Sequence, residues 1–200
     1  MIPMKPIILG GAGTCALAFA LSDVVNREMS PIGETVSRFV NTQHGWLVTV
    51  GLFGFAVTAG ALAVGVPDRA GKWLLGSWAA CLSVAAIFPA DPPGNWDHPS
   101  ISETVHGLAA WTGLAVFTVA VVILTRRWRR NAGTPLPLRP VAVAVVTGMI
   151  LFVITLVDVM AFRVLPPLIG LTERFVVAAD LAWMCLAAVC PHAPRRSPSR

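Results

Sequence analysis

Residues 45–66 read GWLVTVGLFGFAVTAGALAVGV, an unbroken run in which no side chain is charged. A helix needs about 20 apolar residues to cross a hydrocarbon core about 30 Å thick. Backbone that lies in lipid must satisfy its own hydrogen bonds, and a helix does so within one segment. This stretch therefore predicts one membrane-spanning α-helix.

Five further stretches are of similar length and mainly apolar. The predicted spans are Ile7–Val25, Gly45–Val66, Trp73–Ala90, Val105–Thr125, Val141–Phe162 and Ile169–Cys190. The chain is 56% hydrophobic and only 12% charged, whereas soluble domains carry about 25% charged residues. We predict an all-α, polytopic membrane protein: a single six-helix bundle over residues 1–190 and a disordered basic tail over 191–200.

The basic residues gather in alternate loops, and these loops share one side of the predicted bundle. Of the 15 Lys and Arg residues, all but Arg27, Arg38, Arg163 and Arg174 fall at the termini or in the loops after the second and fourth spans. Basic loops stay on the cytoplasmic side of a membrane, so we expect both termini in the cytoplasm and the protein in the plasma membrane. The net charge of +5 is explained by this orientation, so membrane lipids, and not nucleic acid, are the expected partners.

Acidic residues and histidines gather on the opposite, outer side. His106 begins the fourth span, and Asp91 follows the Phe-Pro-Ala turn that ends the third. Histidine exchanges its proton near neutral pH, which suits a general acid or base. We expect the Asp91 carboxylate to turn back toward His106, with Glu34 and Glu173 adding further carboxylates and Ser37 a hydroxyl.

Two more acids lie within predicted spans. Asp180 is near the middle of the sixth span, and Asp158 is about one turn inside the outer end of the fifth. Charged residues at such depth are costly and usually functional. Asp180 shares a helix face with Glu173, seven residues earlier, and Trp183 lies beside that face. Both acids are candidate catalytic residues, and helix packing is the alternative role.

Four segments carry a family resemblance. They are Ser30–Glu34, Phe88–Asp91, His106 with Phe117 downstream, and Gly170-Leu171-Thr172-Glu173-Arg174. Together they resemble the six-helix membrane proteins of domain of unknown function 998. The resemblance implies the six-span topology and marks Glu34, Asp91, His106, Glu173 and Arg174, although Gly33 and His44-Gly45 depart from the pattern. It implies no reaction.

Three functions remain open from the residues. The first is an enzyme that acts on a lipid or amphiphile, by hydrolysis in the simplest case, with His106 and Asp91 as an acid/base pair and Arg174 on a headgroup. The second is an isoprenoid cyclase in which a buried acid such as Asp180 or Asp158 supplies the proton and aromatic rings stabilise the carbocation. The third is a non-catalytic ligand-binding, transport-accessory or scaffold protein. No HxxxH or HExxH spacing is present, so we expect neither a metal nor another cofactor.

Overall fold

The computed structural model describes residues 4–94, 98–132 and 138–189, and these residues form helices and no strand. The elements are α1 (Met4–Val25), the 3₁₀ helix η1 (Val36–Asn41), α2 (Trp46–Gly65), α3 (Arg69–Ile87), α4 (Ile101–Ala132), α5 (Leu138–Val157), the π-helix η2 (Asp158–Phe162) and α6 (Ile169–Val189). All six predicted spans are therefore helices. The predicted disordered tail over 191–200 lies outside the described residues.

Polar residues extend α3 and α4 beyond the predicted bounds of their apolar stretches. α3 begins at Arg69, where Asp68 caps the first turn by accepting a hydrogen bond from Gly71 N at 3.0 Å. The capping oxygen also pairs with Arg127 of α4 at 2.6 Å. α4 runs from Ile101 to Ala132, about 48 Å at 1.5 Å per residue. It is therefore longer than the hydrocarbon core is thick, and its arginine-rich end continues the helix beyond the apolar stretch.

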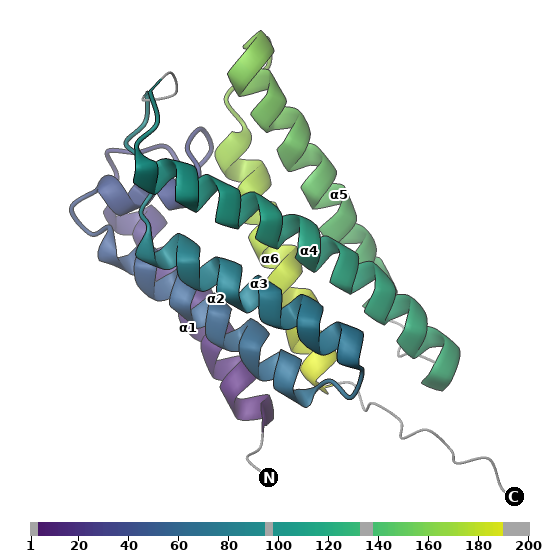
Figure 1. The fold of residues 1–200 in the computed structure, drawn as a ribbon. Helices are drawn as coiled ribbons and strands as arrows, with labels where there is room; N and C mark the ends of the chain where they lie inside the picture. Colours follow the sequence, from purple (N-terminus) through teal and green to yellow (C-terminus); the bar gives the residue numbers. More distant parts are fainter. Residues whose placement is uncertain (1–3, 95–97, 133–137, 190–200) are drawn as a thin grey trace, which may run out of the picture.

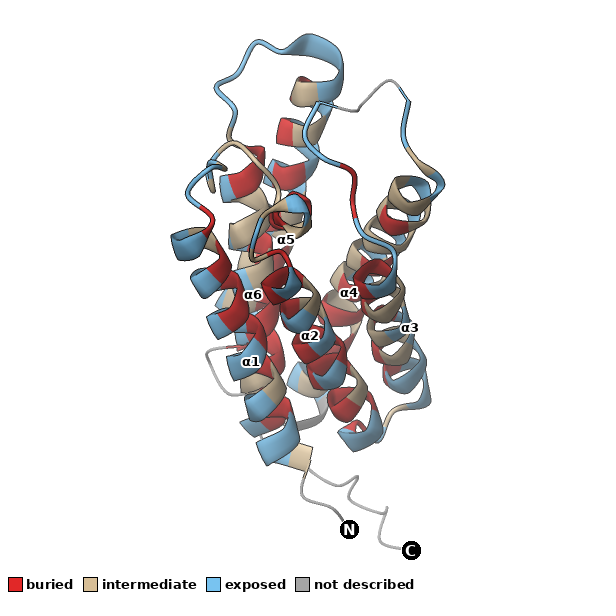
Figure 2. Ribbon diagram, turned by 90° about the vertical axis from the view of Figure 1, so that its left-hand side faces the viewer, coloured by how far each residue is buried: buried red, intermediate tan, exposed pale blue. Residues whose placement is uncertain are grey.

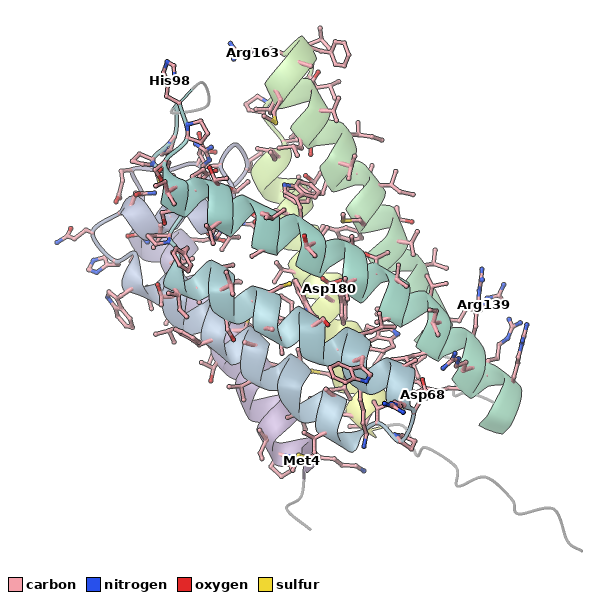
Figure 3. The ribbon with its side chains drawn as sticks, in the orientation of Figure 1. Met4, Asp68, His98, Arg139, Arg163 and Asp180 are labelled. Atoms are coloured by element: carbon pink, nitrogen blue, oxygen red, sulfur yellow. The ribbon has the colours of Figure 1, made fainter. Side chains whose placement is uncertain are left out.

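The helices form an up-and-down bundle (Figures 1 and 2). α1 to α4 pack as consecutive neighbours, α5 packs on α6, and α6 also lies against α1 and α2. Met4, Asp68 and Arg139 mark one end of the bundle, which we call the inner end, and His98 and Arg163 mark the other, the outer end (Figure 3). Buried residues gather inside, and exposed residues cover the outward faces (Figure 2).

Among the described residues, five helices, α1 to α5, are long and apolar enough to cross a membrane, α5 together with η2. Their outward faces carry many exposed large apolar side chains, including Leu17, Val64 and Val143, as expected for surfaces in contact with lipid. α6 has the same length but carries Glu173, Arg174 and Asp180. It packs in the interior against three other helices, so the chain is a multi-pass membrane bundle with a polar helix near its centre.

Close contact between α1 and α2 depends on glycine. A Cβ added at Gly54 would lie 2.9 Å from the Gly11 carbonyl oxygen, and one at Gly11 would lie 2.7 Å from that of Gly54. Small residues let transmembrane helices approach until their backbones touch. This seam fixes the two N-terminal helices as one wall of the interior.

A column of aromatic rings fills the core between α2, α3, α4 and α6. Phe55 meets Trp78 edge to face at 5.5 Å, and Trp78 stacks on Phe117 at 5.6 Å. Phe117 meets Trp183 at 5.7 Å, and Trp183 stacks on Trp128 at 5.7 Å. Such pairs stabilise a core beyond their buried area, so this column holds the centre of the bundle toward its inner end.

Candidate functional site

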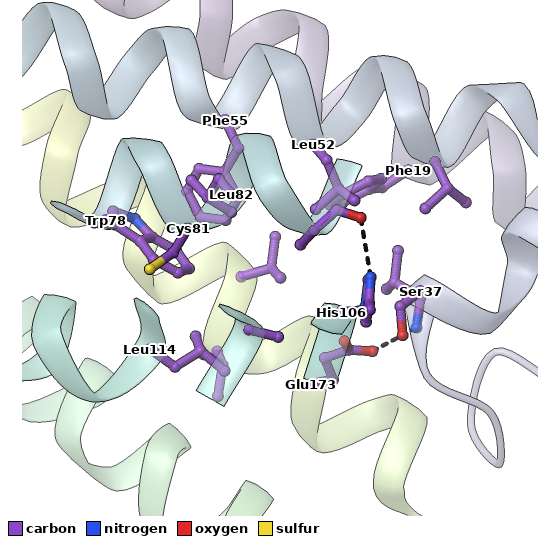
Figure 4. A pocket seen from close by; sticks show the side chains of 16 residues that line it. Phe19, Ser37, Leu52, Phe55, Trp78, Cys81, Leu82, His106, Leu114 and Glu173 are labelled. Atoms are coloured by element: carbon purple, nitrogen blue, oxygen red, sulfur yellow. Dashed lines mark hydrogen bonds between the residues drawn. The ribbon is translucent and has the colours of Figure 1, made fainter. Parts of the chain in front are cut away.

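A pocket of about 60 Å³ opens in the outer half of the bundle. Helices α1, α2, α3, α4 and α6, together with η1, all contribute to its wall. Its lining residues are Phe19, Val36, Ser37, Val48, Leu52, Phe55, Trp78, Cys81, Leu82, Ala85, His106, Ala110, Leu114, Glu173, Val176 and Val177. Figure 4 shows Ser37, His106 and Glu173 at one end and Phe55, Trp78 and Cys81 at the other. The pocket is thus polar at one end and apolar along the rest of its length.

His106 is held in a defined orientation by the end of α3. Its Nδ1 lies 2.9 Å from both the Ala85 and the Phe88 carbonyl oxygens. A helix carbonyl normally accepts from the N–H four residues later, but those positions are Pro89 and Pro92, which have no N–H. The prolines that end α3 therefore leave two carbonyls for the imidazole.

These contacts set the tautomer of His106. A carbonyl oxygen only accepts hydrogen bonds, so Nδ1 must carry the proton, and Nε2 of the neutral ring is left as an acceptor. The side chain is 6% exposed and lines the pocket. The ring therefore has one anchored nitrogen and one nitrogen with proton-accepting capacity.

Glu173 reaches the pocket from the first turns of α6. Its Oε2 accepts a short hydrogen bond from Val36 N at the start of η1. Oε2 therefore holds the start of η1 in place, whereas Oε1 makes no hydrogen bond to any of the described residues. Ser37, the next residue in η1, lines the pocket, and its hydroxyl lies 3.2 Å from Thr35 Oγ1. The structure thus brings together three predicted residues: Ser37, His106 and Glu173.

Asp91 is directed elsewhere than predicted. Its carboxylate accepts from Ser100 N at 2.8 Å and from Ser100 Oγ at 2.6 Å, and its own N–H donates to Glu103 Oε2 at 2.7 Å. Within the described part of the chain, no hydrogen bond joins Asp91 to His106. The expected hydrogen bond between Asp91 and His106 is therefore not formed in this structure. Ser100, which precedes α4, donates to the carboxylate instead.

Arg174 and Glu34 brace the outer end of α6. The Arg174 guanidinium forms a two-pronged ion pair with Asp23 of α1, with Nε 2.8 Å from Oδ2. It also donates to the carbonyl oxygens of Glu34 at 2.9 Å and of Gly170 at 3.0 Å, and it lies over the Phe39 ring. These contacts use most of its donors, so Arg174 joins α1, α6 and the loop before η1. Neither Arg174 nor Glu34 lines the pocket.

Arg38 is a residue that the sequence argument missed. It is 3% exposed, its Nη1 donates to Pro92 O at 3.1 Å, and its Nη2 lies 4.0 Å from Glu103 Oε1. It thereby ties η1 to the loop between α3 and α4. The sequence did offer a signal for its burial. Arg38 lies between the apolar residues Val36 and Phe39, in a segment too short to span the membrane, and apolar neighbours indicate burial.

The remaining predicted residues do not line the pocket. The Asp158 carboxylate accepts from Val164 N and Leu165 N, both at 3.1 Å, and so caps the turn after η2. Trp183 donates from Nε1 to Thr125 Oγ1 at 2.9 Å within the aromatic column. Asp180 lies near the middle of the bundle (Figure 3) and is 1% exposed. Neither of its carboxyl oxygens has a hydrogen-bond partner among the described residues.

Titratable side chains do not cluster as metal ligands would. Within residues 4–94, 98–132 and 138–189, no group of three or more His, Cys, Asp or Glu residues could hold a metal ion. The described cysteines Cys15, Cys81 and Cys185 are free thiols on different helices. The pocket itself presents an imidazole, a carboxyl group and a hydroxyl beside an apolar cavity.

Comparison with known proteins gives a family and no further relative. Residues 9–190 match the family model described as "Protein of unknown function (DUF998)". Neither a curated protein nor a solved structure matches the chain. The match covers all six helices from early in α1 to the end of α6, and it confirms the resemblance carried by the outer-side motifs. The chain therefore belongs to the DUF998 family, whose function is not known.

Proposed function

We propose that this protein binds a lipid or amphiphile in the outer pocket and hydrolyses it. The orientation of His106 carries the proposal, because its anchored Nδ1 leaves Nε2 as a base beside a pocket with an apolar interior. Sites for small molecules are mostly apolar concavities with a few converging polar groups. A volume of about 60 Å³ has room for several groups of the size of a water molecule.

In this proposal the residues at the polar end of the pocket carry out the hydrolysis. The substrate's ester or related bond would lie between Ser37, His106 and Glu173, and its apolar part would pack on Phe55 and Trp78. Nε2 of His106 would take a proton from water as the water oxygen attacks the substrate, and the imidazolium would return that proton to the leaving-group oxygen. Glu173, braced by Val36, would orient the substrate through Oε1.

Charge gives the proposed orientation in the plasma membrane. Lys5, Arg69, Lys72 and Arg139 lie at the inner end, together with the Arg126–Arg130 cluster. The positive-inside rule places this end, and with it both termini, in the cytoplasm. The pocket would then open toward the extracytoplasmic leaflet, and a lipid of that leaflet is the substrate source we propose.

A second candidate is isoprenoid cyclisation, which the aromatic lining of the pocket favours. Phe19, Phe55 and Trp78 all contribute rings to its wall, and ring faces stabilise positive charge. Asp158 and Asp180, the proton donors expected from the sequence, do not line the pocket, whereas Glu173 does. In this reaction Glu173 would therefore supply the proton, and no water would be consumed.

Native mass spectrometry with lipidomics on gently extracted protein tests the proposal. The comparison uses wild type, His106→Ala and the matched control His44→Ala, since His44 lies at the same end outside the pocket. We expect wild type and His44→Ala to release hydrolysis products from added membrane lipid extract, and His106→Ala to retain the intact lipid. A cyclised isoprenoid would favour the second candidate. Binding without turnover in all three proteins would refute catalysis and support a ligand-binding role.

A further inference from the structure

Asp180 is a carboxyl group whose partner is missing from the described chain. It is 1% exposed, and both oxygens lack a hydrogen-bond partner among residues 4–94, 98–132 and 138–189. Buried polar groups in folded proteins are nearly always paired, so an exception requires an explanation. A lone charge in an apolar interior costs several kcal/mol, and intramembrane acids usually have a named partner or a function.

The described helices carry no Lys or Arg at the depth of Asp180. Every Lys and Arg in the described parts of the six α-helices lies within about two turns of a helix end, whereas Asp180 is the twelfth residue of the 21 in α6. α2 contains no basic residue at all. A positive group that paired with Asp180 would therefore come from outside the described helices.

Asp180 lies on α6 about one helical turn beyond the last residues of this helix that line the pocket. Val176 and Val177 line the pocket, and Asp180 follows four and three residues later, about 4.5–6 Å further along the helix axis. The next turn brings Trp183, whose ring meets Phe117 at 5.7 Å. Asp180 thus lies about one turn from the pocket-lining valines of α6 and about one turn from Trp183 of the aromatic column.

Trp78 connects this position to the pocket from the opposite wall. It lines the pocket and stacks on Phe117. Trp78 is nine residues from Arg69 at the inner end of α3, and Asp180 is nine residues from Val189 at the inner end of α6, so their depths agree. Trp78 Nε1 is the other buried side-chain atom without a partner among the described residues. Two unpaired polar groups therefore occupy one layer, beside aromatic rings.

We propose that the ligand of the pocket carries an ammonium group, and that this group pairs with Asp180 in the layer of Trp78, Phe117 and Trp183. An ammonium donates charge-assisted hydrogen bonds to a carboxylate, and aromatic faces attract it. A hard metal ion fits less well, because it takes six or more oxygen ligands and the neighbouring side chains on α6 are valine, tryptophan and methionine. The inference rests on the proposed function, since it names the chemical class of the molecule bound in the same pocket.

Matched probes test this assignment. The protein is placed in nanodiscs of zwitterionic phosphatidylcholine, and binding of octylamine and octan-1-ol is followed by tryptophan fluorescence. The two probes share one chain length and differ in charge. The variants are Asp180→Asn, which keeps the size of the side chain, and Glu28→Gln, which removes an exposed outer acid as a control for surface attraction of the amine.

The wild type and Glu28→Gln should bind octylamine at least about tenfold more tightly than octan-1-ol, because pairing of a buried charge is at stake. Asp180→Asn should lose this preference and keep its affinity for octan-1-ol, which also shows that the variant is folded. Equal affinity of the wild type for both probes would overturn the assignment whatever the variants do. An amine preference that survives in Asp180→Asn would overturn it as well.

The result is separable from that of the hydrolase test. Loss of amine selectivity in Asp180→Asn together with absent turnover in the wild type would refute hydrolysis and leave the ammonium site standing. Turnover that depends on His106, without any preference for octylamine, would refute only the ammonium site.

Discussion

Substitution of Asp180 by leucine asks whether this acid anchors the fold or serves a ligand. The carboxyl has no partner among the described residues, so its removal breaks no described contact. Loss of a buried, unsatisfied polar group relieves about 1–3 kcal/mol. Leucine is larger than aspartate, and overpacking of a core costs about 1–3 kcal/mol. The two terms oppose each other, and we expect the free energy of unfolding of Asp180→Leu to lie within about 1.5 kcal/mol of the wild-type value.

An anchoring role would give a different magnitude. If Asp180 held α6 through a buried ion pair, removal of one partner would cost about 3–5 kcal/mol. The difference between these two outcomes exceeds the error of a denaturation experiment. Reversible unfolding by SDS in mixed micelles, followed by circular dichroism, measures the free energy of unfolding without any ligand.

Asp180→Asn is the matched control, because it keeps the volume of the side chain and leaves a polar group unpaired. We expect it to be about as stable as the wild type. A loss of about 3 kcal/mol or more in Asp180→Leu, with Asp180→Asn unaffected, would refute the reasoning. It would show that the acid makes a structural hydrogen bond that asparagine can replace.

Three further predictions concern packing and the outer brace. Arg174→Lys should destabilise the bundle by about 2–3 kcal/mol, because lysine cannot reproduce the fork that binds a carboxylate and two carbonyls; SDS unfolding measures it, and an unchanged midpoint would contradict the brace. Gly54→Ala should lower the free energy of unfolding by about 1–3 kcal/mol, because the added methyl group would overpack against α1. The control Gly76→Ala, whose Cβ would meet nothing within 4 Å, should raise it by up to about 1 kcal/mol. Equal unfolding midpoints in the two variants would contradict the close contact between α1 and α2. Thr125→Val should cost about 1–3 kcal/mol by leaving Trp183 Nε1 unpaired, visible as a shifted tryptophan emission and a lower midpoint.

The hydropathy pattern predicted that each helix exists but not the residues at which it begins and ends. Each apolar run predicted its helix because the cost of unsatisfied backbone in lipid acts on every segment separately. The ends were set by side chains whose effect depends on a partner. Asp68 extended α3 by capping its first turn, and Ser100 extended α4 in the same way. Residues 191–200, predicted as a tail, are outside what the structure describes.

The candidate site was predicted in part. His106, Glu173 and Ser37 were chosen for their residue type and their side of the membrane, and the structure places all three on one pocket. Asp91 was assigned to His106 because the two residues are close in sequence and on the same side. The start of α4 offered a backbone N–H and a hydroxyl at shorter range, and no sequence pattern reports that competition.

The sequence by itself determined that the chain is a membrane bundle of six helices and that its acids and histidines gather at one end. These are properties of single segments, fixed by hydropathy and by charge. Only the tertiary structure decided which of those polar groups face a cavity, because burial and pairing depend on what other helices bring alongside. The carbonyl oxygens of Ala85 and Phe88 hold His106, because prolines four residues later cannot donate to them. Arg174 pairs with Asp23, and Asp180 has no partner among the described residues. Each of these outcomes depends on which distant segments of the chain meet.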